Sequence, residues 1–187
     1  MLETTAKDNV NLLSKEALHN VIQGNLGLLC QYVKGTVANK WACVILLLQF
    51  IEYLLKHQIQ NDGNKFPKGS DGHNLKKLYG MLEDHQERIE THFNRLMAHK
   101  KQIDPESFGT VEDFVENYHN SYTLFRYWIL EENFETEVPY FYITDTFLVL
   151  ITLMECSDID FDFSEAHSVL QERIALDKVL KAGIINS

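Results

Sequence analysis

One stretch of the sequence, residues 39–60, is apolar around nearly its whole circumference when it is placed on a helical wheel. Its only polar strip consists of Gln49, Glu52 and Lys56. A helix that is apolar almost all round belongs at the centre of a helical bundle. Its most hydrophobic run, residues 41–48, is far shorter than the ~20 residues that cross a membrane. The stretch therefore predicts a central core helix and no membrane span.

The rest of the chain also favours helices. Nine Gly and three Pro among 187 residues are too few for a loop-rich sandwich or barrel. We expect an all-α, up-and-down bundle of about five to six helices that forms a single domain over residues 1–187. The segments expected to be helical are about 14–37, 39–60, 71–100 with a break near Gly80, 110–133, 144–156 and 164–182.

Two local expectations accompany this layout. Ser14 is the expected cap of the first helix, which carries Val21, Leu28, Leu29 and Val33 on one side. Residues 135–142, which surround Pro139, are expected to be extended.

Charge and cysteine content narrow the class of function. The balance of 17 Lys and Arg against 27 Asp and Glu gives a formal net charge of −10, which disfavours a phosphate-binding molecule while leaving room for one local basic patch. Cys30, Cys43 and Cys156 are an odd, widely spaced set without a C-x-x-C pair. They predict reduced, buried thiols and a cytoplasmic protein.

A regular pattern of titratable residues marks the segment HQERIETHFNRLMAH. His85, Arg88, His92, Arg95 and His99 recur at alternating spacings of three and four, along one shoulder of the apolar face of a helix. Such a stripe can contact an anion or RNA and transfer protons, or it can be a solvated flank that covers the core. We treat Arg88, His92, Arg95 and His99 as candidate binding residues. No Asp, Glu or Cys stands at a matching spacing, so we expect no metal site.

The cleanest amphipathic segment, residues 110–133, supplies a second pair. His119 and Arg126 are seven residues apart, on the same shoulder of its apolar face, and they are the candidate catalytic residues. Arg126 has aromatic neighbours, and a buried guanidinium needs a carboxylate. Glu52 is the expected partner. The alternative is an exposed Arg126, with Glu52 paired to Lys56 on its own helix.

Several nucleotide, metal and hydrolase signatures are absent. The sequence contains no G-x-x-x-x-G-K-[ST], G-x-G-x-x-G, H-E-x-x-H or G-x-S-x-G. We therefore expect no cofactor, and the residues by themselves name no reaction.

Three stretches are informative together: FIEYLLKHQI, GHNLKKLYGML and YTLFRYWILEE. In order and spacing they resemble the HEPN superfamily of helical bundles, in particular a bacterial group. Its members carry a Glu-x-x-x-Lys helix, a Gly-His-x-Leu-x-x-Leu turn and a late Arg-Tyr near an acidic residue. The resemblance covers about residues 14–133, with the later helices packed on that part. It implies an up-and-down α-bundle, frequent dimerisation, and an association with RNA cleavage, nucleotide binding and toxin or phage-defence systems.

The chain departs from the ribonuclease members of that superfamily, which carry Arg, four to six residues and then His. Here Arg88/His92 and Arg95/His99 are each separated by only three residues, and the first His after Arg126 is His167. Because kinship of fold does not transfer a reaction, we expect a regulatory or interaction module without the ribonuclease signature. The alternatives are a divergent metal-independent ribonuclease, using Arg126 with His119 or the basic stripe, and a small-nucleotide-binding module.

Surplus apolar surface predicts assembly. Trp128 falls outside the buried arc of its helix, and the PYFY segment adds further aromatic residues. Such surface usually marks an interface, so we expect a symmetric homodimer. Another protein, RNA or a nucleotide are the further candidate partners.

Overall fold

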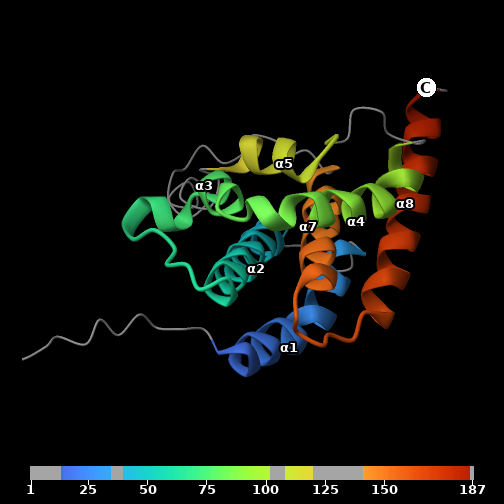
Figure 1. Ribbon diagram of the computed structural model, residues 1–187. Helices are drawn as coiled ribbons and strands as arrows, with labels where there is room; N and C mark the ends of the chain where they lie inside the picture. Colours follow the sequence, from blue (N-terminus) through green and yellow to red (C-terminus); the bar gives the residue numbers. More distant parts are fainter. Residues whose placement is uncertain (1–13, 35–39, 102–107, 120–140, 186–187) are drawn as a thin grey trace, which may run out of the picture.

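The computed structural model describes residues 14–34, 40–101, 108–119 and 141–185 (Figure 1). Within these ranges the protein is all-α, with seven α-helices, one short 3-10 helix and no strand, which confirms the expected helical bundle. The elements are α1 (Lys15–Val33), α2 (Lys40–Asn61), η1 (Gly69–His73), α3 (Leu75–Gly80), α4 (Glu83–Lys101), α5 (Val111–Tyr118), α7 (Phe141–Cys156) and α8 (Ser164–Ile185).

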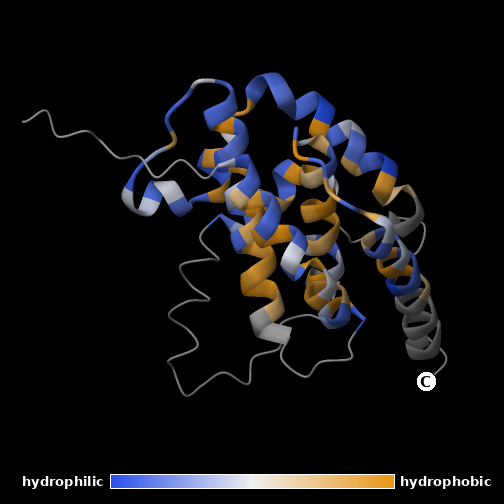
Figure 2. Ribbon diagram, turned by 90° about the horizontal axis from the view of Figure 1, so that it is seen from below, coloured by the Kyte–Doolittle hydropathy of each residue, from blue (hydrophilic) through white to orange (hydrophobic). Residues whose placement is uncertain are grey.

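The helix α7 lies in the middle of the bundle, where it packs against α2, α4 and α8 (Figure 1). Every side chain over residues 143–154 is buried. The neighbouring α2 is also largely buried, and Figure 2 shows hydrophobic residues concentrated along the inner helices, with hydrophilic residues outside. The helices α1 and α8 pack against each other, as do α3 and α5. In the described part of the chain, no helix is both long and apolar enough to cross a membrane.

Side-chain caps fix the beginnings of several helices. Ser14 Oγ accepts a hydrogen bond from the Ala17 backbone at 3.1 Å, which is the expected cap of α1. Asn74 caps α3 and Thr110 caps α5 in the same way. The expected break near Gly80 is present, because α3 ends there and α4 begins at Glu83.

Two sequence expectations were wrong in part. Leu29 and Val33 are buried, but Val21 and Leu28 lie on the exposed side of α1, because its buried face is formed by Leu18, Ile22, Leu26, Leu29, Cys30 and Val33. Residues 141–142 are helical rather than extended, because α7 begins directly after the position of Pro139 and Tyr140. Trp128 and the rest of the expected extended segment lie outside the described residues.

Candidate functional site

The narrow polar strip of α2 holds a buried carboxylate. The Glu52 side chain is only 3% exposed, and its Oε1 accepts a hydrogen bond from Lys56 Nζ at 2.6 Å. His73, from η1, places Nδ1 at 3.1 Å from both Glu52 oxygens. An ionised carboxylate only accepts hydrogen bonds, so we assign the proton of this contact to Nδ1 of His73. Two of the segments that carry the HEPN resemblance thus meet at one ion-paired cluster, which we call the Glu52 cluster (Glu52, Lys56 and His73).

The loop after α2 is shaped to bring His73 onto Glu52. Gly72 packs so closely on the Pro67 carbonyl that a Cβ at this position would lie 2.5 Å from its oxygen. Gly69 has a φ of +66°, in the left-handed region that favours glycine. Phe66 from the same loop lies under Lys56, with the ammonium 5.1 Å from the ring centroid. The loop therefore encloses Lys56 and leaves the His73 side chain 41% exposed.

The predicted pair of Glu52 and Arg126 cannot be placed, because Arg126 lies outside the described residues. The alternative pairing of Glu52 with Lys56 along the same helix is present. His119, the other candidate catalytic residue, forms the end of α5, where its Nδ1 lies 2.5 Å from the Glu116 carbonyl oxygen. The assignment of Arg126 and His119 as a catalytic pair stays a prediction.

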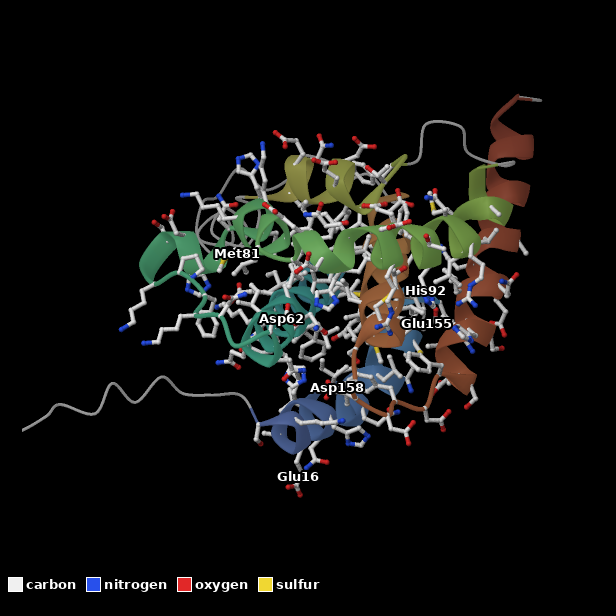
Figure 3. All side chains as sticks on the ribbon, viewed as in Figure 1. Glu16, Asp62, Met81, His92, Glu155 and Asp158 are labelled. Atoms are coloured by element: carbon white, nitrogen blue, oxygen red, sulfur yellow. The ribbon has the colours of Figure 1, made fainter. Side chains whose placement is uncertain are left out.

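The candidate binding stripe lies along α4, and its members contact other helices. His92 Nδ1 and Arg95 Nη2 lie 3.4 Å and 2.6 Å from the same oxygen of Glu155, near the end of α7. Figure 3 shows His92 and Glu155 close together at the junction of α4 and α7. His85 pairs with Asp62 beyond the end of α2, at 3.0 Å. The side chain of His99 lies outside the described residues.

Glu155 is contacted by three side chains from two neighbouring helices, although the sequence analysis did not single it out. Its side chain is 12% exposed, and His167 of α8 approaches its second oxygen at 2.9 Å. One carboxylate oxygen of Glu155 thus faces His92 and Arg95 of α4, and the other faces His167 of α8. Because Glu155 belongs to the central helix, this group, which we call the Glu155 junction, ties α4 and α8 to α7.

Arg88 lines a small cavity, beside the thiol of Cys156. The cavity has a volume of about 20 Å³, room for about one water molecule, and Gln58, His85, Arg88 and Cys156 contribute to its lining. Burial raises the pKa of the Cys156 thiol to about 11, and the smaller effect of Arg88 opposes it. The thiol is therefore protonated at neutral pH and is no activated nucleophile.

A third cluster joins α1, α2 and the turn after α7. His57 is buried, and its Nε2 lies 2.9 Å from Asp158 Oδ1, which also accepts a hydrogen bond from Asn61. Lys15 of α1 reaches the other Asp158 oxygen at 3.2 Å. Partial burial of Asp158 favours a higher pKa, but the hydrogen bonds from His57 and Lys15 outweigh it and lower the pKa of this carboxyl below its ordinary value.

Glu90 serves as a cap for a neighbouring helix. Its carboxylate accepts hydrogen bonds from the backbone N–H groups of Val111 and Glu112, at the start of α5, and from the Tyr79 hydroxyl. A carboxylate at a helix N-terminus is favoured by the helix dipole. Burial, and then the hydrogen bond to Glu90, raise the pKa of Tyr79. Glu90 of α4 therefore has a structural role, because it caps the start of α5.

Among the described residues, no group of three or more His, Cys, Asp or Glu side chains is arranged to hold a metal ion. Comparisons with protein-family models, with curated proteins and with solved structures each gave no significant match. The resemblance to the HEPN superfamily stays a prediction, based on the three sequence stretches.

Proposed function

We propose that the chain is a HEPN-like regulatory or interaction module that acts through protein surfaces, assembles as a homodimer and does not cleave RNA. The observation that carries this proposal is the pairing of the α4 stripe. His92 and Arg95 both face Glu155, so the groups expected to contact RNA instead hold α4 on α7. An RNA phosphate would have to compete with the Glu155 carboxylate for these groups.

The wider charge distribution supports the same proposal. In the described part of the chain, six basic side chains lie within 4.0 Å of a carboxylate: Lys15, Lys34, Lys56, Lys76, Lys77 and Arg95. The whole chain has a formal net charge of −10. Long-range attraction for a nucleic acid is therefore weak, because most of this basic charge is neutralised locally.

The Glu52 cluster supports the HEPN-like assignment without supplying the ribonuclease chemistry. It joins the Glu-x-x-x-Lys and Gly-His motifs in space, so these motifs act as one structural unit. The Arg and His spacing of the ribonuclease members is missing from the sequence. The resemblance implies a connection to RNA, nucleotides, toxins or defence systems. Regulation through binding is the role that does not require the ribonuclease spacing of Arg and His.

A direct experiment incubates the purified protein with mixed-sequence RNA in the presence of a chelator, beside Arg126→Ala and His119→Ala variants. We expect intact RNA in all three samples. Cleavage by the wild-type protein that is lost in either variant would overturn the proposal in favour of a divergent metal-independent ribonuclease. Cleavage that is retained in both variants would be measured again after a second purification under different conditions. Activity that disappears there comes from a contaminating nuclease, and activity that persists would overturn the proposal in favour of a ribonuclease that uses the basic stripe of α4.

A second candidate function is the binding of a small nucleotide, and the loop after α2 favours it. In this loop, residues 62–74, two lysines and two aspartates balance in formal charge, but Asp62 already pairs with His85 and Asp71 with Lys77. Lys65 and Lys68 are exposed in this loop, and the His73 side chain at its end is 41% exposed. Their ammonium groups are suited to bind phosphate oxygens.

A thermal-shift titration with nucleoside mono-, di- and triphosphates tests this candidate. A rise in melting temperature that disappears in a Lys65→Ala/Lys68→Ala variant would support it. The matched control is Lys76→Ala/Lys77→Ala, which removes two lysines that already pair with Glu116 and Asp71. The absence of any nucleotide-dependent shift in the wild-type protein would exclude nucleotide binding at this loop.

A further inference from the structure

The small cavity beside Arg88 opens between three helices, where α2 and α4 both pack against α7 (Figure 1). Its apolar lining consists of five buried side chains: Leu54, Leu55, Leu82, Ile89 and Leu153. The other lining residues bring polar groups or a thiol: Gln58, His85, Arg88, Cys156 and Ser157. The enclosed part has a volume of about 20 Å³, and the space reaches about 320 Å³ when its open mouth is included. This space, which we call the Arg88 pocket, is of a size for a small molecule.

Arg88 brings a positive charge to the pocket that no described side chain balances. Arg95, two turns further along α4, pairs with Glu155 at 2.6 Å, whereas no carboxylate oxygen in the described part of the chain lies within 4.0 Å of the Arg88 guanidinium. The guanidinium instead donates a hydrogen bond to the sulfur of Cys156. Burial raises the pKa of this thiol to about 11, so the thiol is neutral at pH 7 and supplies no counter-charge.

The carboxylates that adjoin the pocket already have partners of their own. Asp62 accepts a hydrogen bond from Gln58 at 3.2 Å and pairs with His85 at 3.0 Å. Glu155, which precedes Cys156 in the chain, is held by side chains of α4 and α8 in the Glu155 junction. The Arg88 guanidinium, with five N–H donors, is therefore the cation of the pocket that can bind the charge of a ligand.

We propose that the Arg88 pocket binds a short aliphatic monocarboxylate such as butanoate. The carboxylate would accept two parallel hydrogen bonds from the guanidinium, whose planar arrangement of donors matches the two oxygens. The aliphatic tail would bury its surface against the leucine and isoleucine side chains, and the enclosed part of the pocket has room for about one methyl group. This ligand goes beyond the proposed function, and its site does not depend on the dimer.

Charge and size select this class of ligand. The formal net charge of −10 and the acidic groups of Asp62 and Glu155 disfavour a doubly charged phosphate more than a singly charged carboxylate. An uncharged alcohol would leave the Arg88 guanidinium without a counter-charge. Because butanoate has few atoms with which to form contacts, we expect a modest dissociation constant, on the order of 0.1–10 mM.

A titration of the ¹⁵N-labelled protein with sodium butanoate, followed by the NMR shifts of its backbone amides, tests the site. Sodium chloride is withdrawn as butanoate is added, so that the ionic strength stays constant. We expect saturable shifts, the largest of them at Gln58, Ile89 and Cys156. The absence of saturable shifts at ~100 mM butanoate, or largest shifts at residues outside the pocket, would overturn the proposal.

Two comparison ligands separate the charge from the tail. Butan-1-ol has the tail without the carboxylate, and inorganic phosphate has the charge without the tail. Each should bind at least about tenfold more weakly than butanoate, because each lacks one of the two contacts. Binding of butan-1-ol as tight as that of butanoate would show that Arg88 does not hold the ligand. Equally tight binding of phosphate would show a general anion site, and either result would overturn the proposal.

A matched pair of arginine variants assigns the charge to one residue. Arg88→Gln should raise the dissociation constant of butanoate at least about tenfold, and because Arg88 is exposed this substitution should preserve the fold. Arg95→Gln removes the same charge from the same helix, but Arg95 already pairs with Glu155, so this control should change the constant by less than about twofold. Butanoate binding that is unchanged in Arg88→Gln would overturn the proposal. An equal loss in both variants would show long-range attraction instead of a site, and would overturn it as well.

Discussion

His73 holds its Nδ1 at 3.1 Å from each carboxylate oxygen of Glu52, and so fastens the loop after α2 to a central helix. The carboxylate is buried and also accepts from Lys56, so its charge is balanced inside the protein. Breaking a buried pair by removing one partner costs far more than replacing both partners with apolar groups. A comparison of single and double substitutions therefore measures how much the Glu52 cluster contributes to stability.

Glu52→Leu should lower the free energy of unfolding by about 3–5 kcal/mol, because it leaves the enclosed Lys56 ammonium without a carboxylate. Glu52→Leu/Lys56→Met should cost much less than the single variant, because no buried charge remains. Urea unfolding followed by circular dichroism measures both. Equal losses in the single and double variants would show that Lys56 is not held by Glu52 in solution.

Gly72→Ala should destabilise the protein by about 1–3 kcal/mol, because the added Cβ would lie 2.5 Å from the backbone oxygen of Pro67. Gly80→Ala is the matched control, since a Cβ there meets no atom within 4 Å. It should be neutral, or stabilising by up to ~1 kcal/mol through reduced entropy of the unfolded chain. The two melting curves give the comparison, and a similar effect of both substitutions would contradict the close packing at Gly72.

Asp158 should make stability depend on acidity. Its folded-state pKa lies below the ordinary value of 3.8, owing to His57 and Lys15. The ionised group therefore stabilises the fold above pH 3.8, and this contribution is lost as the pH falls through the lower folded-state pKa. The difference in unfolding free energy between wild type and Asp158→Asn should be largest near neutral pH. It should shrink as the pH falls below 3.8. A difference that grows on acidification would reverse the assigned sign.

Substitutions at Arg95 and at Glu155, two members of the Glu155 junction, should have different effects on stability. The Arg95 side chain is 63% exposed, so Arg95→Ala should cost less than ~1 kcal/mol, and salt should reduce the effect further. Glu155→Gln should cost more, about 1–3 kcal/mol, because His92, Arg95 and His167 all lose a charged acceptor. Unfolding at low and high salt measures both, and a larger cost for Arg95→Ala would contradict this account of the junction.

The existence of most helices followed from local sequence signals. The apolar circumference of α2, the caps Ser14 and Thr110, and the break after Gly80 all depend on residues that are close in the chain. The exposed side of α1 was harder to predict, because apolar residues occur on both of its sides. Only packing against α2 and α8 decides that Leu29 is buried and that Leu28 is exposed.

The contacts of the candidate site depend on longer connections and were largely missed. His73 reaches Glu52 through a loop whose path depends on the tight packing of Gly72 on Pro67, which no periodicity reveals. Arg95 finds Glu155 across 60 residues because α4 and α7 happen to be neighbours in the bundle. The sequence indicated which helix face carried the basic stripe, but the acidic partner came from another helix.

The mass of the purified wild-type protein in solution tests the central claim, which is that the chain functions by assembling through its surface. Light scattering would follow the mass over about a hundredfold range of protein concentration. We predict a rise from 21.7 kDa toward twice that value, with no dependence on added RNA. A mass that stays at 21.7 kDa at the highest concentration, or that rises only when RNA is present, would contradict the account.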